Sequence, residues 1–153
     1  MTWESIFALV NWIAIAGWVL LLVFPRRPKV LAAILYLGVG LLCLAYLAMI
    51  VGMHSGWIDA ARPAGTPQPN FLDYNIAGLQ NLFVSDGGLV LGWTHYLAFD
   101  LFAGLWIARD ADAKGFSRIA QAPVLLLTFL VGPVGLLVWL AVREARARVG
   151  KSG

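Results

Sequence analysis

The sequence predicts an all-α integral membrane protein, folded as a four-helix bundle with one short amphipathic helix between the second and third spans. Of its 153 residues, 61% are hydrophobic and only 12% are charged, whereas soluble domains carry about 25% charged residues. Four segments also have the roughly 20 mostly apolar residues that crossing a bilayer requires. Backbone groups in lipid must be bonded internally, so helices are the expected form. The length predicts a single transmembrane domain over residues 1–153.

The expected spans cover residues 6–24, 30–53, 88–108 and 120–142, each boundary being approximate. The first stops at PRRP, and the last runs into the basic stretch REARARVGK. The N-terminal stretch MTWESIFALVNW has no Lys or Arg, whereas a secretory signal begins with a basic region. The first segment is therefore expected to remain as a spanning helix.

The composition changes between the second and third spans. Residues 54–70 contain three prolines and predict an irregular, solvated loop. In residues 71–84, apolar side chains recur at helical spacing and polar ones fall elsewhere. This pattern predicts a short amphipathic helix, which either lies on the membrane surface or packs as a cap over the span ends.

The basic residues give no clear orientation under the positive-inside rule. With four full spans, the 25–29 and 109–118 loops share one side and carry six Lys or Arg, against five in the 54–87 loop and the tail. The acid-bearing, lysine-free 54–87 loop favours both termini outside. Basic and aromatic residues do not interleave as in single-strand binders, so nucleic-acid binding is not expected.

Asp100 stands in the middle of the third span, in LAFDLFAG. A charged Asp at a helix centre costs about 2.5–3.5 kcal/mol on insertion scales. Asp100 must therefore face the bundle interior, find a partner or hold a proton. It is expected near the membrane midplane, at the depth of Thr128 and the Gly132-Pro133 pair. The polar groups expected to meet about one and a half turns nearer the surface are Asn11, Tyr46 and His95.

The spacing of His95 and Asp100 argues against a direct pair. Five residues at about 100° each place them about 140° apart around an ideal helix. Any pairing is expected to use a neighbouring helix or a bound ligand. One stripe of the third span holds Trp93, Tyr96, Asp100, Gly104 and Ile107, and another holds His95, Phe99, Phe102 and Trp106.

The GPVG stretch interrupts the fourth span. Pro133 removes a backbone hydrogen bond and frees a carbonyl one turn earlier. The functional interpretation is a kink that widens a cavity beside Asp100. The alternative is ordinary packing, because Gly and Pro are more frequent in spans than in soluble helices.

Two stretches, WTHYLAFDLFAGLWIARDADAKG and LLLTFLVGPVGLLVWL, resemble the conserved half of the neoxanthin-synthase-like (abscisic-acid-deficient-four-like) family of small four-span membrane proteins. The resemblance rests on about a third of the chain. The matching positions are Trp93, His95, Tyr96, Leu97, Ala98, Phe99, Asp100, Leu101, Phe102, Gly104, Trp106, Asp110, Phe129, Gly132, Pro133, Gly135, Leu136 and Leu137.

The resemblance implies carotenoid chemistry, because plant members are tied to the step from violaxanthin to neoxanthin. That step is an isomerisation that opens an epoxide and forms an allene, so no redox cofactor is expected. It needs an acid near the epoxide oxygen and a base near the departing proton. Asp100 and His95 are the catalytic candidates, with Tyr46 and Asn11 in support. The binding candidates are Trp93, Tyr96, Phe99, Gly104, Thr128, Gly132, Pro133 and Asp110.

Two hypotheses follow. The chain either modifies a carotenoid or related isoprenoid, or is a non-enzymatic scaffold, assembly or pigment-binding protein in which His95 and Asp100 close structural hydrogen bonds. A proton pathway has little support, because the four spans offer only one acid and one histidine for a relay. A metal site has little support, because Cys43 is the single cysteine and His54 and Asp110 fall near opposite faces. The expected location is a bacterial inner membrane, with a homo-oligomer left open. Asp110 also fits a solvated loop with local charge pairing.

Overall fold

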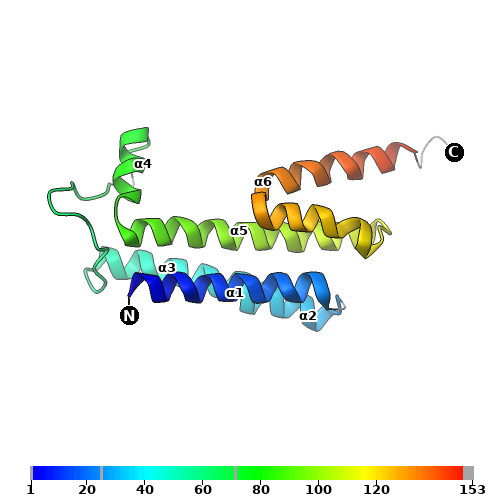
Figure 1. Cartoon of the computed structure of the whole chain (residues 1–153), viewed down its shortest axis with the longest axis horizontal. Helices are drawn as coiled ribbons and strands as arrows, with labels where there is room; N and C mark the ends of the chain where they lie inside the picture. The colour runs from blue at the N-terminus through cyan, green and yellow to red at the C-terminus, as the bar shows by residue number, and fades with distance from the viewer. Residues whose placement is uncertain (1, 25, 71, 150–153) are drawn as a thin grey trace.

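The computed structural model describes residues 2–24, 26–70 and 72–149, and it confirms the all-α fold class. Four helices are long and apolar enough to cross a membrane. They are α1 (Trp3–Val23), the continuous helix formed by α2 (Pro28–Ala33), η1 (Ile34–Gly40) and α3 (Leu41–His54), α5 (Asp86–Ala113) and α6 (Arg118–Val149). Figure 1 shows α1, α3 and α5 side by side along the long axis of the molecule.

Side-chain caps set where the helices begin. Thr2 accepts a hydrogen bond from the Ser5 amide at the start of α1, and Ser85 accepts one from the Gly88 amide at the start of α5. Each cap satisfies an amide that the first turn of a helix leaves without a partner. Pro28 occupies the first turn of α2, where a missing N–H costs nothing.

The second long helix changes register in its middle. Its η1 section is a π-helix, with wider turns than the α-helical sections on either side. Gly38 lies in this section and contacts α5 so closely that an added Cβ would overlap Leu101. The π section therefore serves packing against α1 and α5.

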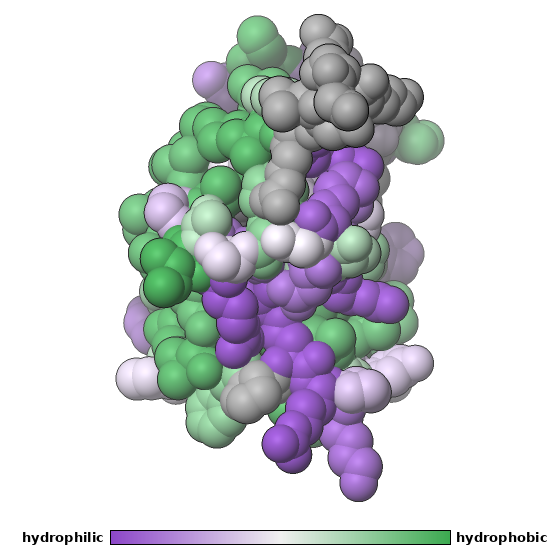
Figure 2. All heavy atoms as spheres, turned by 90° about the vertical axis from the view of Figure 1, so that its right-hand side faces the viewer, coloured by the Kyte–Doolittle hydropathy of each residue, from purple (hydrophilic) through white to green (hydrophobic). Residues whose placement is uncertain are grey.

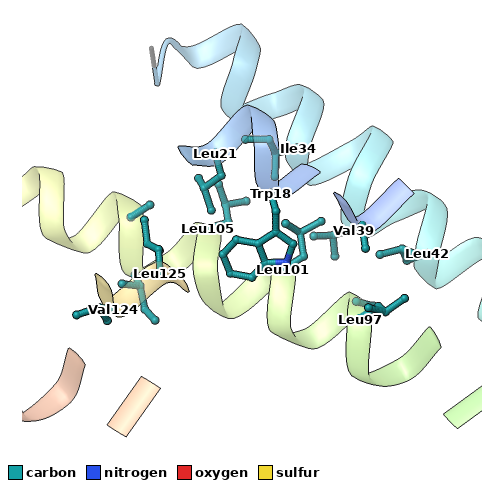
Figure 3. Packing of buried hydrophobic residues seen from close by; sticks show 14 of the residues in the cluster. Trp18, Leu21, Ile34, Val39, Leu42, Leu97, Leu101, Leu105, Val124 and Leu125 are labelled. Atoms are coloured by element: carbon teal, nitrogen blue, oxygen red, sulfur yellow. The ribbon is translucent and has the colours of Figure 1, made fainter. Parts of the chain in front are cut away.

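The main core lies where α1, η1 and α5 meet. Trp18 is 4% exposed and Leu101 is fully buried, and Figure 3 shows the Trp18 indole beside Leu101. Between membrane helices, association depends on close van der Waals packing. This core fixes the face of α5 that turns inward, and Asp100 lies next to Leu101 on that helix.

The amphipathic helix is α4 (Ile76–Phe83), which is shorter than the predicted 71–84 segment. Two of its apolar side chains are not covered by the bundle, since Ile76 is 77% exposed and Leu79 is 54% exposed, whereas Phe83 reaches Gly92 of α5. Figure 1 shows α4 standing across the direction of α5 at the start of that helix. This exposure favours a position in the membrane surface over a packed cap.

The fourth apolar helix, α6, folds back on itself. Val131 has the non-helical torsions φ −146° and ψ 58°, and Figure 1 shows the chain reversing direction there. A straight helix would place Phe116 and Trp139 about 34 Å apart. Instead their rings touch edge to face with centroids 5.1 Å apart. We call residues 118–130 the outgoing half and residues 132–149 the return half.

The fold-back corrects the expected topology. The sequence placed the basic tail on the side opposite the 109–118 loop, but Arg143 pairs with Asp110 at 3.3 Å. At the rise of an α-helix, the outgoing half is about 20 Å long, whereas a hydrocarbon core is about 30 Å thick. The turn at Val131 therefore lies within the bilayer, and the return half ends on the side where α6 begins.

Candidate functional site

A groove of about 570 Å³ lies between α5 and the return half of α6. It opens on the outer surface of the bundle, which lipid would surround, and its lining is mostly apolar. Three large aromatic side chains from α5 line one wall, and the turn of α6 and its return half form the other. The lining residues are Phe99, Asp100, Phe102, Ala103, Trp106, Gly132, Pro133, Leu136 and Leu140.

Asp100 is the polar side chain of this groove. It is 8% exposed, and its Oδ2 atom has no hydrogen-bond partner among the described residues. The turn of α6 lies directly against Asp100, since an added Cβ on Gly132 would overlap the carboxyl group. A buried polar atom without a partner is costly. Asp100 therefore offers an unused hydrogen-bonding position to whatever fills the groove.

The break in α6 places the first backbone amides of the return half beside this carboxyl group. The return half begins at Gly132, and the first amides of a helix have no intrahelical partner and carry partial positive charge. The Tyr96 hydroxyl donates to the Leu130 carbonyl at 3.4 Å and also lies beside the Gly132 amide and the Asp100 carboxyl. Tyr96, Asp100 and the α6 turn thus form one polar cluster inside an apolar groove.

The structure groups the other predicted polar residues away from this cluster. The Trp93 indole donates to Asn11 Oδ1 at 3.2 Å, and the ring centroids of Tyr46 and His95 are 5.6 Å apart. These contacts agree with the shared depth expected from the sequence. None of the four lines the groove, and His95 is exposed.

His95 and Asp100 do not form a pair, as the helix geometry predicted. The His95 ring stacks on Phe99 at 4.6 Å, and Phe99 stands between it and the groove. The four catalytic candidates are therefore not brought together: Asp100 lies in the groove, and His95, Tyr46 and Asn11 lie elsewhere. Among the binding candidates, those that line the groove or contact its carboxyl group are Phe99, Gly132, Pro133 and Tyr96.

Two further binding candidates hold the bundle together. A Cβ on Gly104 would overlap the Trp18 indole, so Gly104 permits close contact between α5 and α1. Thr128 donates to the Val124 carbonyl at 2.8 Å, and its backbone contacts Gly135 across the α6 turn. Both residues therefore shape the groove indirectly, by fixing the helices around it.

Asp110 is more than a solvated loop residue. It accepts a hydrogen bond from the Trp139 indole at 3.0 Å and pairs with Lys114 at 3.2 Å and with Arg143 at 3.3 Å. Two of these partners belong to the return half of α6. Asp110 therefore anchors the return half against the end of α5.

Sequence reasoning missed the contribution of the return half to the groove wall. The kink expected at the GPVG stretch beside Asp100 is present, but Leu136 and Leu140 were placed in a span that continued across the membrane, and Phe102 in a helix stripe without a role. The available signal was Pro133 directly after a glycine, because proline is favoured in the first turn of a new helix. In the described part of the chain, no three His, Cys, Asp or Glu side chains gather as metal ligands.

Four helices long and apolar enough to cross a membrane, with an apolar groove on the outer surface of the bundle that holds one carboxyl group, define an integral membrane protein. The family model described as ABA DEFICIENT 4-like matches residues 5–139. The chain therefore belongs to the ABA4-like family. No curated protein and no solved structure matches the chain significantly.

Proposed function

We propose that this protein binds one end of a carotenoid or related isoprenoid in the α5–α6 groove and isomerises it by acid–base chemistry without a redox change. The observation that carries this proposal is the unpartnered Asp100 oxygen in an aromatic groove of about 570 Å³ that opens toward lipid. A long apolar molecule can enter such a groove from the bilayer, with an oxygen function at its end reaching the carboxyl group.

The chemistry requires two proton positions. Opening an epoxide to an allene delivers one proton to oxygen and removes one from carbon, with no net oxidation. Asp100 and Tyr96 are the two proton-carrying side chains at the α6 turn. We assign Asp100 to donate the proton to the oxygen; the carboxylate that this leaves takes up the proton released from carbon, which restores the starting protonation state, and Tyr96 positions the carboxyl group. The separation of His95 from the groove removes it from direct contact with the ligand.

That same separation supports a second candidate function, pigment binding without catalysis. A groove with a single carboxyl group has less acid–base machinery than the predicted Asp100 and His95 set. In this alternative Asp100 holds the oxygen of the ligand by a hydrogen bond.

Helical bundles are typical of inner membranes, whereas outer membranes hold barrels, so we place the protein in a bacterial inner membrane.

The test is to express the chain in carotenoid-producing hosts that supply hydroxylated or epoxidised pigments, and to analyse both the total pigments and those that co-purify. Catalysis predicts a new isomer with the native chain and none with Asp100→Asn. Binding alone predicts co-purified pigment with an unchanged pigment profile. The matched control is Asp59→Asn, an exposed loop carboxylate outside the groove. If no host yields either a new isomer or co-purified pigment, both functions are refuted.

A further inference from the structure

The fold-back of α6 gathers the basic residues at one end of the molecule. We call this the basic end; it is formed by the α1–α2 connection, the α5–α6 turn and the return half of α6. Figure 2 looks onto it and shows a hydrophilic band crossing an apolar surface. The Lys and Arg side chains described there are Arg26, Arg27, Lys29, Arg109, Lys114, Arg118 and Arg143.

The opposite end carries the reverse charge. Among the described residues there, Arg62 is the single Lys or Arg. The acidic residues there are Glu4, Asp59, Asp73 and Asp86. The molecule is therefore electrically polar along the axis that would cross the membrane, a property that a straight fourth span would have cancelled.

Carboxylates at the basic end neutralise only some of its cations. Asp112 pairs with Arg26 at 2.8 Å, and Asp110 pairs with Lys114 and Arg143. Four exposed cations have no carboxylate within ion-pair distance among the described residues. They are Arg27, Lys29, Arg109 and Arg118.

We propose that the basic end is a docking surface for the anionic phosphate headgroups of the cytoplasmic leaflet. Loops rich in Lys and Arg lie on the cytoplasmic side of membrane proteins, and anionic lipids there attract basic segments next to spans. This assignment places the N-terminus of α1 outside and the end of α6 inside. It is independent of what the groove binds.

The first experiment measures orientation. A reporter that works only in the cytoplasm and one that works only outside it are each fused to either end of the full chain. We expect the cytoplasmic reporter to be active at the C-terminus and the external reporter at the N-terminus. Both ends on the same side, or the reverse arrangement, would overturn the assignment.

The second experiment measures lipid binding by the purified full chain in neutral detergent, by titrating phosphatidylglycerol or phosphatidylcholine and following the melting temperature. The variant combines Arg27→Gln, Lys29→Gln and Arg109→Gln, and the matched control is Arg62→Gln at the other end. We expect the native chain to bind phosphatidylglycerol more tightly than phosphatidylcholine. Each charge removed from the basic end should weaken phosphatidylglycerol binding about fivefold, and the control variant should bind it as the native chain does.

Three results would overturn lipid docking. The first is equal affinity for the two lipids. The second is retention of the preference in the triple variant. The third is inorganic phosphate alone reproducing the effect of phosphatidylglycerol, which would assign these cations to a free anion. High salt should weaken the native preference, because exposed charges are screened.

Discussion

Cross-linking can test directly whether α6 folds back inside the membrane. Residues 116 and 139 would lie about 34 Å from each other if one continuous helix joined them. In the folded-back arrangement the rings of Phe116 and Trp139 are in contact, with centroids 5.1 Å apart. The two arrangements differ by far more than the reach of a short bis-maleimide, which makes the outcome unambiguous.

The variant combines Phe116→Cys and Trp139→Cys in a Cys43→Ser background, because Cys43 is the single native cysteine. Loss of the Trp139 indole removes one hydrogen bond to Asp110, but the Arg143 ion pair to the same carboxylate remains. After reaction in membranes, trypsin separates residues 115–118 from residues 119–143. The folded-back arrangement predicts that these two peptides are recovered as one covalent product.

The matched control joins Trp93→Cys with Phe116→Cys, which have the same separation in sequence. Most of that separation is the straight helix α5. At the rise of an α-helix these positions lie about 30 Å apart, so they should not react together. Cross-linking at dilute protein excludes links between molecules. Failure to recover the 116–139 product, with both cysteines shown to be reactive singly, would refute the folded-back arrangement.

Two further substitutions test the contacts that hold the fold. Gly135→Ala would push a Cβ into the backbone of Thr128, which cannot move aside as a side chain would; overpacking of this kind costs about 1–3 kcal/mol. We expect a lower melting temperature, whereas Gly40→Ala, at an exposed position, should be neutral or slightly stabilising. Arg26→Met leaves buried carbonyl and amide oxygens without their donor, at a cost of about 1–3 kcal/mol, and the exposed Arg27→Met is the control. A melting temperature unaltered by Gly135→Ala or Arg26→Met would contradict these contacts.

Composition was enough to locate the apolar helices, because lipid leaves the backbone few alternatives. The predicted 6–24 and 30–53 segments differ from Trp3–Val23 and Pro28–His54 by only a few residues at each end. The π-helical section was not predictable, because it is a local change of hydrogen-bond register whose packing partner, Leu101 of α5, is distant in the sequence.

The fold-back of α6 was missed for a different reason. Hydropathy averaged over a window is the same for a straight helix and for two halves that fold against each other. What distinguishes them is tertiary contact: Gly135 against Thr128, and Asp110 with Trp139 and Arg143. The position of Asp100 beside the Gly132-Pro133 pair was predictable from its helix stripe and its depth, whereas the groove wall formed by Leu136 and Leu140 depends on the reversal of the chain. With four straight spans the Lys and Arg residues divide almost equally between the two sides of the membrane. Membrane proteins usually concentrate them on one side, so this equal division was itself a sign that one span turns back.

The break in α6 and the carboxyl of Asp100 are best understood together. A helix broken inside the bilayer exposes amides and carbonyls that lipid cannot satisfy. A carboxyl group inside a span has the same difficulty. At the α6 turn the Tyr96 hydroxyl donates to the Leu130 carbonyl and lies beside the Asp100 carboxyl group, yet the Oδ2 atom of Asp100 has no partner among the described residues. The return half leaves the aromatic wall of α5 uncovered beside that oxygen, and this combination is the observation on which the proposed ligand with an apolar body and a polar end rests.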